Sequence, residues 1–440
     1  MTSLPVLSGS AVVLCIFFIF LVPLAGAGLS LINAGLGRSR SAAHSMLASM
    51  CVISIAAIVY VVWGFSWQGF IGRPAHAFIL GGKSWNWIAA EPLFFRGLAL
   101  DGAPASLAAW LQMLSVGIAA LIPLGSGSDR WRFGAACAST VVLAGVIYPI
   151  FGHWVWGGGW LAQLGINYGM GHGFIDAGGA APIQVVGGLT ALSLTWILGP
   201  RRAKYPPDGI PAAIPGHNAV VVLFGCLLAW TGWTALNSAG AILFTAAEPI
   251  RAVLIAVNTT LAAASSCLVT VVITRIRFGK PDASLSANGW VGGLVASCAA
   301  CAFIKPAAAI MIGIIAGALV TFSVEALDRL AIDDPGGAVS VHAVGGLWSI
   351  LALGIFAHIP SPAANPLHSG DSGQWLAQVV GIATLLGFVL PLSYGLNSLL
   401  NYFYPQRVAA EGERQGMDLY ELGAGAYPEF VTHSEDFTLR

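Results

Sequence analysis

The chain has 440 residues, a formal net charge of zero, 57% hydrophobic residues and only 9% charged residues. A soluble globular protein carries about a quarter charged residues, so this composition excludes that class and predicts an integral membrane protein. The 19 basic residues balance the 19 acidic ones, so the charge gives no sign of a nucleic-acid partner.

Apolar runs long enough for a spanning helix of about 20 residues occur along the whole chain. They predict an all-α integral membrane protein with eleven transmembrane helices, at residues 11–36, 42–67, 107–125, 133–153, 180–198, 219–244, 252–272, 287–303, 307–327, 338–356 and 376–402. No Lys or Arg precedes the first run, so we expect the first helix to be retained rather than cleaved as a signal peptide.

Basic residues fix the expected orientation, because they gather on the cytoplasmic side of membrane proteins. With the N-terminus outside, the inner side receives Arg38, Arg40, Arg130, Arg132, Arg201, Arg202, Lys204, Arg275, Arg277, Lys280, Arg329, Arg407, Arg414 and Arg440. The outer side receives only Arg73, Lys83, Arg96, Arg251 and Lys305. The sequence therefore predicts an outer N-terminus and an inner C-terminus.

The cysteines lie inside apolar runs, and none has the spacing of metal ligands. Buried apolar thiols usually serve as inert packing groups. We therefore expect no disulfide, no metal and no cofactor.

Two segments 158 residues apart read alike: DAGGAAPIQVVGGL at 176–189 matches DPGGAVSVHAVGGL at 334–347 at eight of fourteen positions. Five predicted helices separate the copies, an odd number, so the copies run through the membrane in opposite directions. This pattern is typical of two inverted halves that place a substrate path at their interface. It predicts a transmembrane domain over 1–402, with halves at about 8–200 and 215–357 and an additional helix at 376–402. A cytoplasmic tail follows at 403–440.

Each copy places polar residues at a helix start and two turns further on. Asp176 and Asp334 stand where a carboxylate can cap free backbone N–H groups, which is a structural role. Gln184 and His342 lie eight residues later, and the inverted symmetry brings them together near mid-membrane. A polar pair inside apolar helices is costly, which favours a pore-lining function over a purely structural hydrogen bond.

Further motifs give the chain a family resemblance. They are AGLGRS at 34–39, VWGFS at 62–66, RWRFG at 130–134, HWVWGGGW at 153–160, DDP at 333–335 with the following Val341-His342, GMDL at 416–419 and AYP at 426–428. In this order they resemble the ammonium transporter (Amt/Mep/Rh) family over nearly the whole chain. The resemblance implies a multi-pass protein of the cell (inner) membrane and a homotrimer of eleven-helix subunits. Each subunit would have its own narrow pore for ammonium or ammonia.

The family's functional positions are only partly conserved in type. The resemblance assigns an external ammonium recruitment site to Trp156 and Asp176, where Trp156 can face a cation. The serine of that site corresponds to Gly240. The two stacked phenylalanines of the family's gate correspond to Ser115 and Leu236.

The family's twin histidines become Gln184 and His342. Paired imidazoles can relay a proton, whereas a glutamine amide has no accessible pKa and can only donate or accept hydrogen bonds. The pair is therefore better suited to holding ammonium than to relaying its proton.

Two functions stay open at this point: an ammonium uptake channel, and a non-conducting ammonium sensor that signals through its cytoplasmic C-terminus. The family includes sensors fused to kinases, but only 12 residues follow Pro428 here. Either a downstream kinase is a separate partner or a longer natural sensor-kinase fusion has been trimmed. PII-type regulators are further expected partners at this face. No nucleophile–base, metal or haem pattern lies on facing helices, so an enzyme is not expected.

Overall fold

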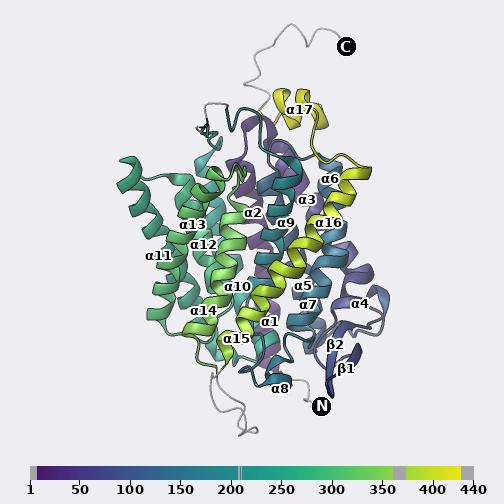
Figure 1. Ribbon diagram of the computed structural model, residues 1–440. Helices are drawn as coiled ribbons and strands as arrows, with labels where there is room; N and C mark the ends of the chain where they lie inside the picture. The colour runs from purple at the N-terminus through teal and green to yellow at the C-terminus, as the bar shows by residue number, and fades with distance from the viewer. Residues whose placement is uncertain (1–6, 207–208, 210, 360–372, 428–440) are drawn as a thin grey trace.

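The computed structural model describes residues 7–206, 209, 211–359 and 373–427. Long helices stand side by side and form one body, with α17 at one end and the β1–β2 hairpin at the other (Figure 1). The elements along the chain are α1 (Gly9–Leu21), α2 (Pro23–Leu36), η1 (Ser39–Ser41), α3 (Ala42–Val59), η2 (Tyr60–Gly64), α4 (Phe65–Gln68), β1 (Ala75–Leu80), β2 (Lys83–Ala89), η3 (Leu93–Phe95), α5 (Pro104–Gly127), α6 (Phe133–Val142), η4 (Leu143–Ile147), α7 (Tyr148–Trp156), α8 (Leu164–Tyr168), η5 (Ala180–Val185), α9 (Val186–Leu198), α10 (Ala219–Thr245), η6 (Pro249–Arg251), α11 (Ala252–Phe278), α12 (Ala283–Ser297), α13 (Pro306–Arg329), η7 (Val339–Val344), α14 (Gly345–Phe356), α15 (Gln374–Thr384), η8 (Leu385–Val389), α16 (Leu390–Phe403), α17 (Ala410–Gln415) and η9 (Asp418–Leu422).

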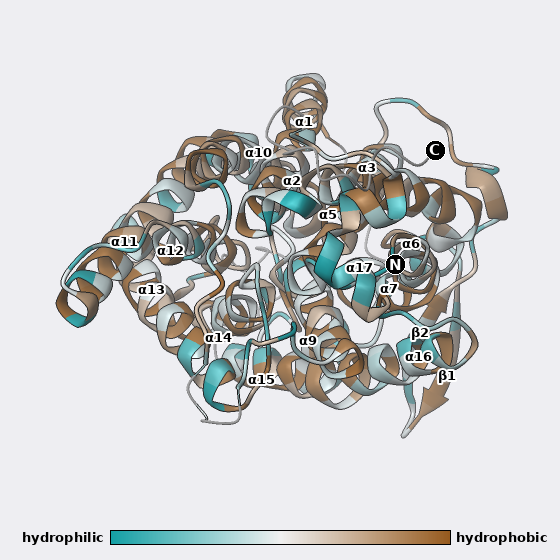
Figure 2. Ribbon diagram, turned by 90° about the horizontal axis from the view of Figure 1, so that it is seen from above, coloured by the Kyte–Doolittle hydropathy of each residue, from teal (hydrophilic) through white to brown (hydrophobic). Residues whose placement is uncertain are grey.

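Ten helical stretches of the described chain are long and apolar enough to cross a membrane. They are Gly9–Leu36, Ser39–Gln68, Pro104–Gly127, Phe133–Trp156, Ala180–Leu198, Ala219–Thr245, Pro249–Phe278, Pro306–Arg329, Val339–Phe356 and Gln374–Phe403. They coincide with ten of the runs expected from the sequence. Hydrophobic residues cover most of the perimeter, and hydrophilic ones gather around α17 when the molecule is seen from above (Figure 2).

The remaining expected span, 287–303, differs from the structure. Helix α12 ends at Ser297 after 15 residues, and the chain continues in turns to Phe303. The reason is local, because the carbonyls of Cys298 and Ala299 accept hydrogen bonds from the backbone N–H groups of Gly178 and Ala177. A continuous α-helix would use those carbonyls internally.

The outer loop after the second span also corrects the all-α expectation. Strands β1 and β2 form an antiparallel hairpin within residues 75–89. The Trp85 ring is buried against Tyr168, with ring centroids 5.4 Å apart. Tyr168 lies in the loop between Trp156 and Asp176. The hairpin therefore holds part of the loop that precedes the first copy of the repeat.

Small residues let the long helices approach each other closely. A side chain at Gly28 of α2 would begin 2.5 Å from the backbone nitrogen of Ala229 in α10, and one at Gly232 would begin 2.0 Å from the nitrogen of Ala25. Van der Waals contact, rather than the hydrophobic effect, drives helix association in lipid, so such close crossings stabilise the bundle.

Several spans change to a wider π-helical turn along their length. These turns include η5 and η7, which contain Gln184 and His342 respectively. π-Turns are rare and occur frequently at functional sites. The two copies of the sequence repeat therefore share an unusual backbone conformation as well as a sequence pattern.

Candidate functional site

The Asp176 carboxylate is buried at the start of η5 and accepts backbone hydrogen bonds. The N–H groups of Gly179 and Ala180 donate to one oxygen at 2.8 and 3.0 Å, and that of Ala181 donates to the other at 2.6 Å. These are helix-start donors that have no partner within the helix. Asp176 thus fixes the turn from which the rest of the site is built.

Trp156 ends α7 next to this turn. Its indole N–H donates to the backbone carbonyl of Asp176 at 2.9 Å. The Phe244 ring stacks on one face of Trp156, with centroids 4.2 Å apart and planes at 12°. A cation–π contact with this indole would therefore have to use the opposite face, because the edge of an aromatic ring is electropositive.

Phe244 has no counterpart among the residues expected from the sequence. It lies four residues after Gly240 in α10, so helical spacing places both on one face of that helix. The spacing from Gly240 could have indicated Phe244 as a site residue, but only once the position of the Trp156–Asp176 turn was known.

Gly240 is in tight contact with this turn. A Cβ atom added at Gly240 would lie 2.3 Å from the carbonyl oxygen of Ala177. A serine hydroxyl in this position would therefore require the Asp176 turn to move. Glycine is the residue that this backbone arrangement accepts.

Ser115 and Leu236, the two residues aligned with gate positions, are both buried. The Ser115 hydroxyl donates to the carbonyl of Leu111 in its own helix at 2.8 Å. Neither residue presents an aromatic ring, and the aromatic stack of this region is instead formed by Trp156 and Phe244.

Gln184 and His342 contact each other in the interior of the bundle. The distance between His342 Nδ1 and Gln184 Oε1 is 2.7 Å. An amide oxygen only accepts, so Nδ1 carries the proton and Nε2 of the neutral ring is an acceptor. The Gln184 amide nitrogen has no hydrogen-bond partner within the described chain, and the Trp233 ring lies 6.4 Å from the imidazole.

The second copy of the motif repeats the carboxylate cap. Asp334 accepts the backbone N–H groups of Ala338 and Val339 at 3.0 and 2.9 Å. It also accepts the Ser126 hydroxyl at 2.6 Å, a side-chain bond for which Asp176 has no equivalent within the described residues.

The contacts between the copies are themselves paired. A Cβ atom at Gly188 would meet the Ala343 nitrogen at 2.3 Å, and one at Gly346 would meet the Val185 side chain at 2.6 Å. Because 346 and 343 follow 188 and 185 by the same 158 residues, these two contacts are related by a local two-fold axis.

The backbone gives a second example of the same pairing. The N–H of Gly178 donates to Cys298 after α12, and the N–H of Gly336 donates to Gly125 at the end of α5. The last turns of α12 and α5 therefore hold the two carboxylate caps in the same way.

An ion-pair network lies beside the Asp334 cap and was not expected from the sequence. Arg201 binds both carboxylate oxygens of Asp333 at 2.9 and 3.0 Å and contacts Asp129 at 3.3 Å. Arg130 is fully buried and donates to the Asp333 carbonyl at 2.8 Å. Burial raises the pKa of Asp333, but the bonds from Arg201 and the charge of Arg130 outweigh it and hold that pKa below its ordinary 3.8.

The tail contacts this same end through two carboxylates. Asp418 accepts the backbone N–H groups of Ala43 and His44 at 3.2 and 2.7 Å, at the start of α3. Glu421 accepts the N–H of Phe133 at 2.8 Å, at the start of α6, and lies 2.9 Å from His44 Nε2.

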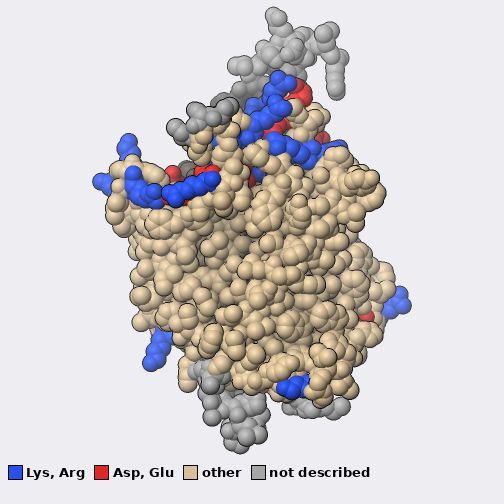
Figure 3. All heavy atoms as spheres, viewed as in Figure 1, with Lys and Arg blue, Asp and Glu red and all other residues tan. Residues whose placement is uncertain are grey.

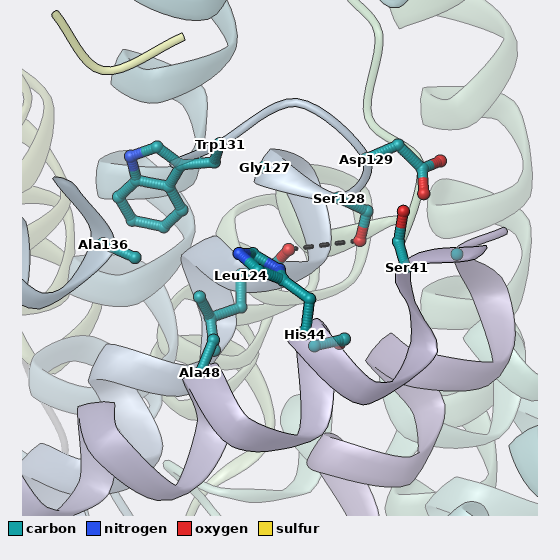
Figure 4. Close-up of a pocket in the computed structure, with 11 residues that line it drawn as sticks. Ser41, His44, Ala48, Leu124, Gly127, Ser128, Asp129, Trp131 and Ala136 are labelled. Atoms are coloured by element: carbon teal, nitrogen blue, oxygen red, sulfur yellow. Dashed lines mark hydrogen bonds between the residues drawn. The ribbon is translucent and has the colours of Figure 1, made fainter. Parts of the chain in front are cut away.

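His44, near the start of α3, is buried. It is only 8% exposed, and its side chain points into a cavity of about 20 Å³ (Figure 4). Leu124, Ser128 and Trp131 also line this cavity, and the Ser128 hydroxyl donates to the Leu124 carbonyl at 3.2 Å.

Charged side chains are distributed unevenly over the molecule. On the face shown in Figure 3, Lys, Arg, Asp and Glu gather at the α17 end, and a broad uncharged band follows. Only a few Lys or Arg side chains appear at the opposite end.

Comparisons with known proteins agree on one family. A family model described as Ammonium Transporter Family matches residues 12–427. The ammonium transporter Amt2 of Archaeoglobus fulgidus is 34% identical, over 96% of this chain and 88% of that protein. The ammonium transporter of Bacillus subtilis is 31% identical, over 94% and 97%. Among solved structures, one named Sensor Amt Protein superposes with a TM-score of 0.82 at 28% identity, covering 93% of this chain and 97% of that one. Mep2 of Candida albicans reaches 0.77 at 22% identity over 95% and 90%, which supports the fold alone.

Proposed function

This chain belongs to the ammonium transporter family, and from that premise we propose that it binds ammonium at the outer end and mediates its transport across the membrane. The observation that carries the proposal is the turn formed by Trp156 and Asp176. It places an indole, covered on one face by Phe244, beside a buried carboxylate. Asp176 acts mainly as a support for the site, since its oxygens hold backbone N–H groups.

In this proposal Ser115 and Leu236 are the gate positions and Gln184 and His342 line the pore at mid-membrane. Moving NH4+ unaided into a dry pore costs on the order of tens of kcal/mol in the Born limit. The cation must therefore lose its proton or keep polar partners. The amide of Gln184 supplies hydrogen bonds but carries no proton onward, so conduction is expected to be weaker than through two imidazoles.

We place this site in an eleven-helix, multi-pass subunit of the inner cell membrane, with the N-terminus outside and the C-terminus inside. The short α12 serves as the eighth span, the two-fold contacts at Gly188 and Gly346 support two inverted halves, and the charges at the α17 end support its cytoplasmic location. The domain limits remain 1–402 for the membrane domain and 403–440 for the tail, of which 428–440 lie outside the described residues. The family relationship favours a homotrimer.

Ammonium sensing is the second candidate, and the Gln184–His342 pair favours it because binding would persist where proton relay fails. The tail offers an output, since Asp418 and Glu421 hold it on the starts of α3 and α6. A PII-type regulator or a kinase that binds at this face would then respond to the position of the tail.

The two candidates are separated by ammonium-evoked current in liposomes that contain the purified protein. Transport predicts a saturating current that His342→Ala abolishes. Sensing predicts ammonium binding without current, and a current gained in Gln184→His. Ser193→Ala is the matched control, because this buried hydroxyl bonds only to the Leu189 carbonyl of its own helix.

The binding site itself is tested by Trp156→Ala. Calorimetry should show ammonium affinity reduced by roughly tenfold or more, as expected for loss of a desolvated cation–π contact, in a protein that keeps its oligomeric state. Unchanged affinity in this variant rejects the outer site, whichever way the current measurement turns out.

A further inference from the structure

A second group of polar side chains lies beside the outer site, and the function proposed above uses only its Ser115, as a gate position. It joins the ends of the second and fourth spans to α5, and we name it the lateral cluster. All of its members are at most 1% exposed: Tyr60, Gln68, Gln112, Ser115, Tyr148 and His153.

These side chains form one connected group. The Tyr60 hydroxyl donates to Gln112 Oε1 at 2.5 Å, and the rings of Tyr60 and Tyr148 lie edge to face with centroids 6.3 Å apart. The Tyr148 hydroxyl lies close to the side chains of Ser115 and Gln68 without a hydrogen bond to either. His153 Nδ1 donates to the backbone carbonyl of Gln68 at 2.8 Å.

Several polar atoms of the cluster have no hydrogen-bond partner anywhere in the described chain. They are both side-chain polar atoms of Gln68, the Gln112 amide nitrogen, the Tyr148 hydroxyl and His153 Nε2. Buried polar atoms without partners are costly, and each asks for a bound polar species or another explanation. Three of the five atoms can accept a hydrogen bond and point to a bound occupant that donates, whereas the two amide nitrogens can only donate and would not bind it.

The inventory of donors and acceptors limits what that occupant is. Because His153 Nδ1 donates to a carbonyl, Nε2 of the neutral ring is an acceptor. With Gln68 Oε1 and the Tyr148 hydroxyl, the cluster offers three acceptors to a small donor. A ring nitrogen among them suits an N–H donor such as ammonium better than an alkali cation.

Gly152 leaves room for the Gln68 amide, since a Cβ atom there would lie 2.6 Å from Gln68 Nε2.

We propose that the lateral cluster is a second ammonium-binding site, held by Gln68, Tyr148 and His153 and reached past the small side chain of Ser115. The proposal rests on the proposed function, because it assumes that ammonium enters at Trp156 and Asp176. Ser115 is the link, since its side chain adjoins the Tyr148 hydroxyl and an aromatic ring in its place would cover the cluster.

The test is calorimetric titration of the purified full-length protein with ammonium chloride, with potassium chloride as the competing cation. Two ammonium sites per chain are expected. Tyr148→Phe removes one unpartnered hydroxyl and keeps the ring, so it should weaken one site by roughly tenfold and leave the other unchanged. Ser115→Phe should remove the same site without deleting any of the proposed ligands, and Tyr60→Phe is the control that keeps all three.

The outcomes separate this proposal from the one on which it rests. One site that Trp156→Ala abolishes and Tyr148→Phe and Ser115→Phe leave intact means that water fills the lateral cluster, and it overturns the second site alone. No ammonium binding in a protein with a normal melting temperature overturns both. Equal binding of potassium at the second site overturns its assignment to ammonium.

Discussion

The two copies of the repeated motif, at Asp176 and at Asp334, begin alike and differ in their surroundings. Asp176 and Asp334 each hold consecutive backbone N–H groups at the start of a π-turn. Next to Asp334 lie the paired charges of Arg201 and Asp333, whereas next to Asp176 lie the stacked rings of Trp156 and Phe244.

The difference teaches that one local structure serves two purposes according to its neighbours. Beside Asp334, Arg130 and Arg201 pair with Asp333 and Asp129 and hold the loops to each other, so we expect the cap there to be structural. Beside Asp176, no arginine competes for the carboxylate among the contacts of the described chain, and an indole that can contact a cation lies next to it. We therefore expect only the Asp176 cap to form part of the proposed binding site.

The largest effect should follow removal of either cap. Asp176→Ala and Asp334→Ala each leave buried N–H groups without partners, which should lower the free energy of unfolding by at least ~3 kcal/mol. Thermal melting measures this loss, and calorimetry on whatever folded protein remains should show impaired ammonium binding for Asp176→Ala only.

Asp176→Asn and Asp334→Asn are the matched controls, because an amide oxygen still accepts part of the bonds. A well-formed Asp176→Ala protein with unchanged ammonium affinity would contradict both the cap and its role in the site.

The ion pairs of the inner end give the next largest effect. Arg201→Met leaves Asp333 buried without its bidentate partner, which should cost about 3–5 kcal/mol at neutral pH. Arg414→Met is the control, since that arginine pairs with Glu411 on the exposed surface.

The pH dependence has a definite sign. The pKa of Asp333 lies below its ordinary 3.8, so its pairing stabilises the folded protein above that pH and is lost as the pH falls further. The stability gap between the wild type and Arg201→Met should therefore narrow on acidification below about pH 4. A gap that widens in acid would show that Asp333 is not the group involved.

The apolar runs predicted most of the membrane-spanning helices because lipid requires long uninterrupted hydrophobic helices. The pattern could not reveal that α12 ends at Ser297, since its last carbonyls are used by Gly178 and Ala177 from a distant segment. The contact between Gln184 and His342 followed from the repeat.

Other parts of the site depend on tertiary packing that sequence spacing does not encode. The stack of Phe244 on Trp156 joins two helices far apart in the chain, and so does the bond of Glu421 to Phe133. The contact of His44 with Glu421 spans 377 positions, so sequence spacing does not reveal it.

The docked tail should respond more weakly, because only a few bonds hold it. Burial raises the pKa of Glu421, but the bonds from His44 and from the Phe133 N–H outweigh it and hold that pKa below its ordinary 4.5. Glu421→Gln should speed hydrogen exchange of residues 418–422 by roughly tenfold at neutral pH. The wild type should lose this protection, measured relative to the intrinsic exchange rate at each pH, as the pH falls below about 4.5. In Glu421→Gln the protection of the same residues should change little. Glu411→Gln, at an exposed pair, should behave as the wild type, and equal exchange in all three proteins would show that Glu421 does not hold the tail.

The smallest effect is expected from exchanging the central pair, in the variant Gln184→His with His342→Gln. The paired contacts at Gly188 and Gly346 make the two positions nearly equivalent, so the hydrogen bond between the side chains should survive the exchange. The remaining asymmetry is the Trp233 ring, which lies 6.4 Å from the His342 imidazole. After the exchange this ring faces an amide in place of the imidazole. We expect melting to report a loss below ~1 kcal/mol and ammonium affinity to stay within a fewfold of the wild type. The single variants serve as controls, because each creates a pair of identical side chains. A loss as large as that of Arg201→Met would mean that the equivalence of the two copies ends at their carboxylate caps.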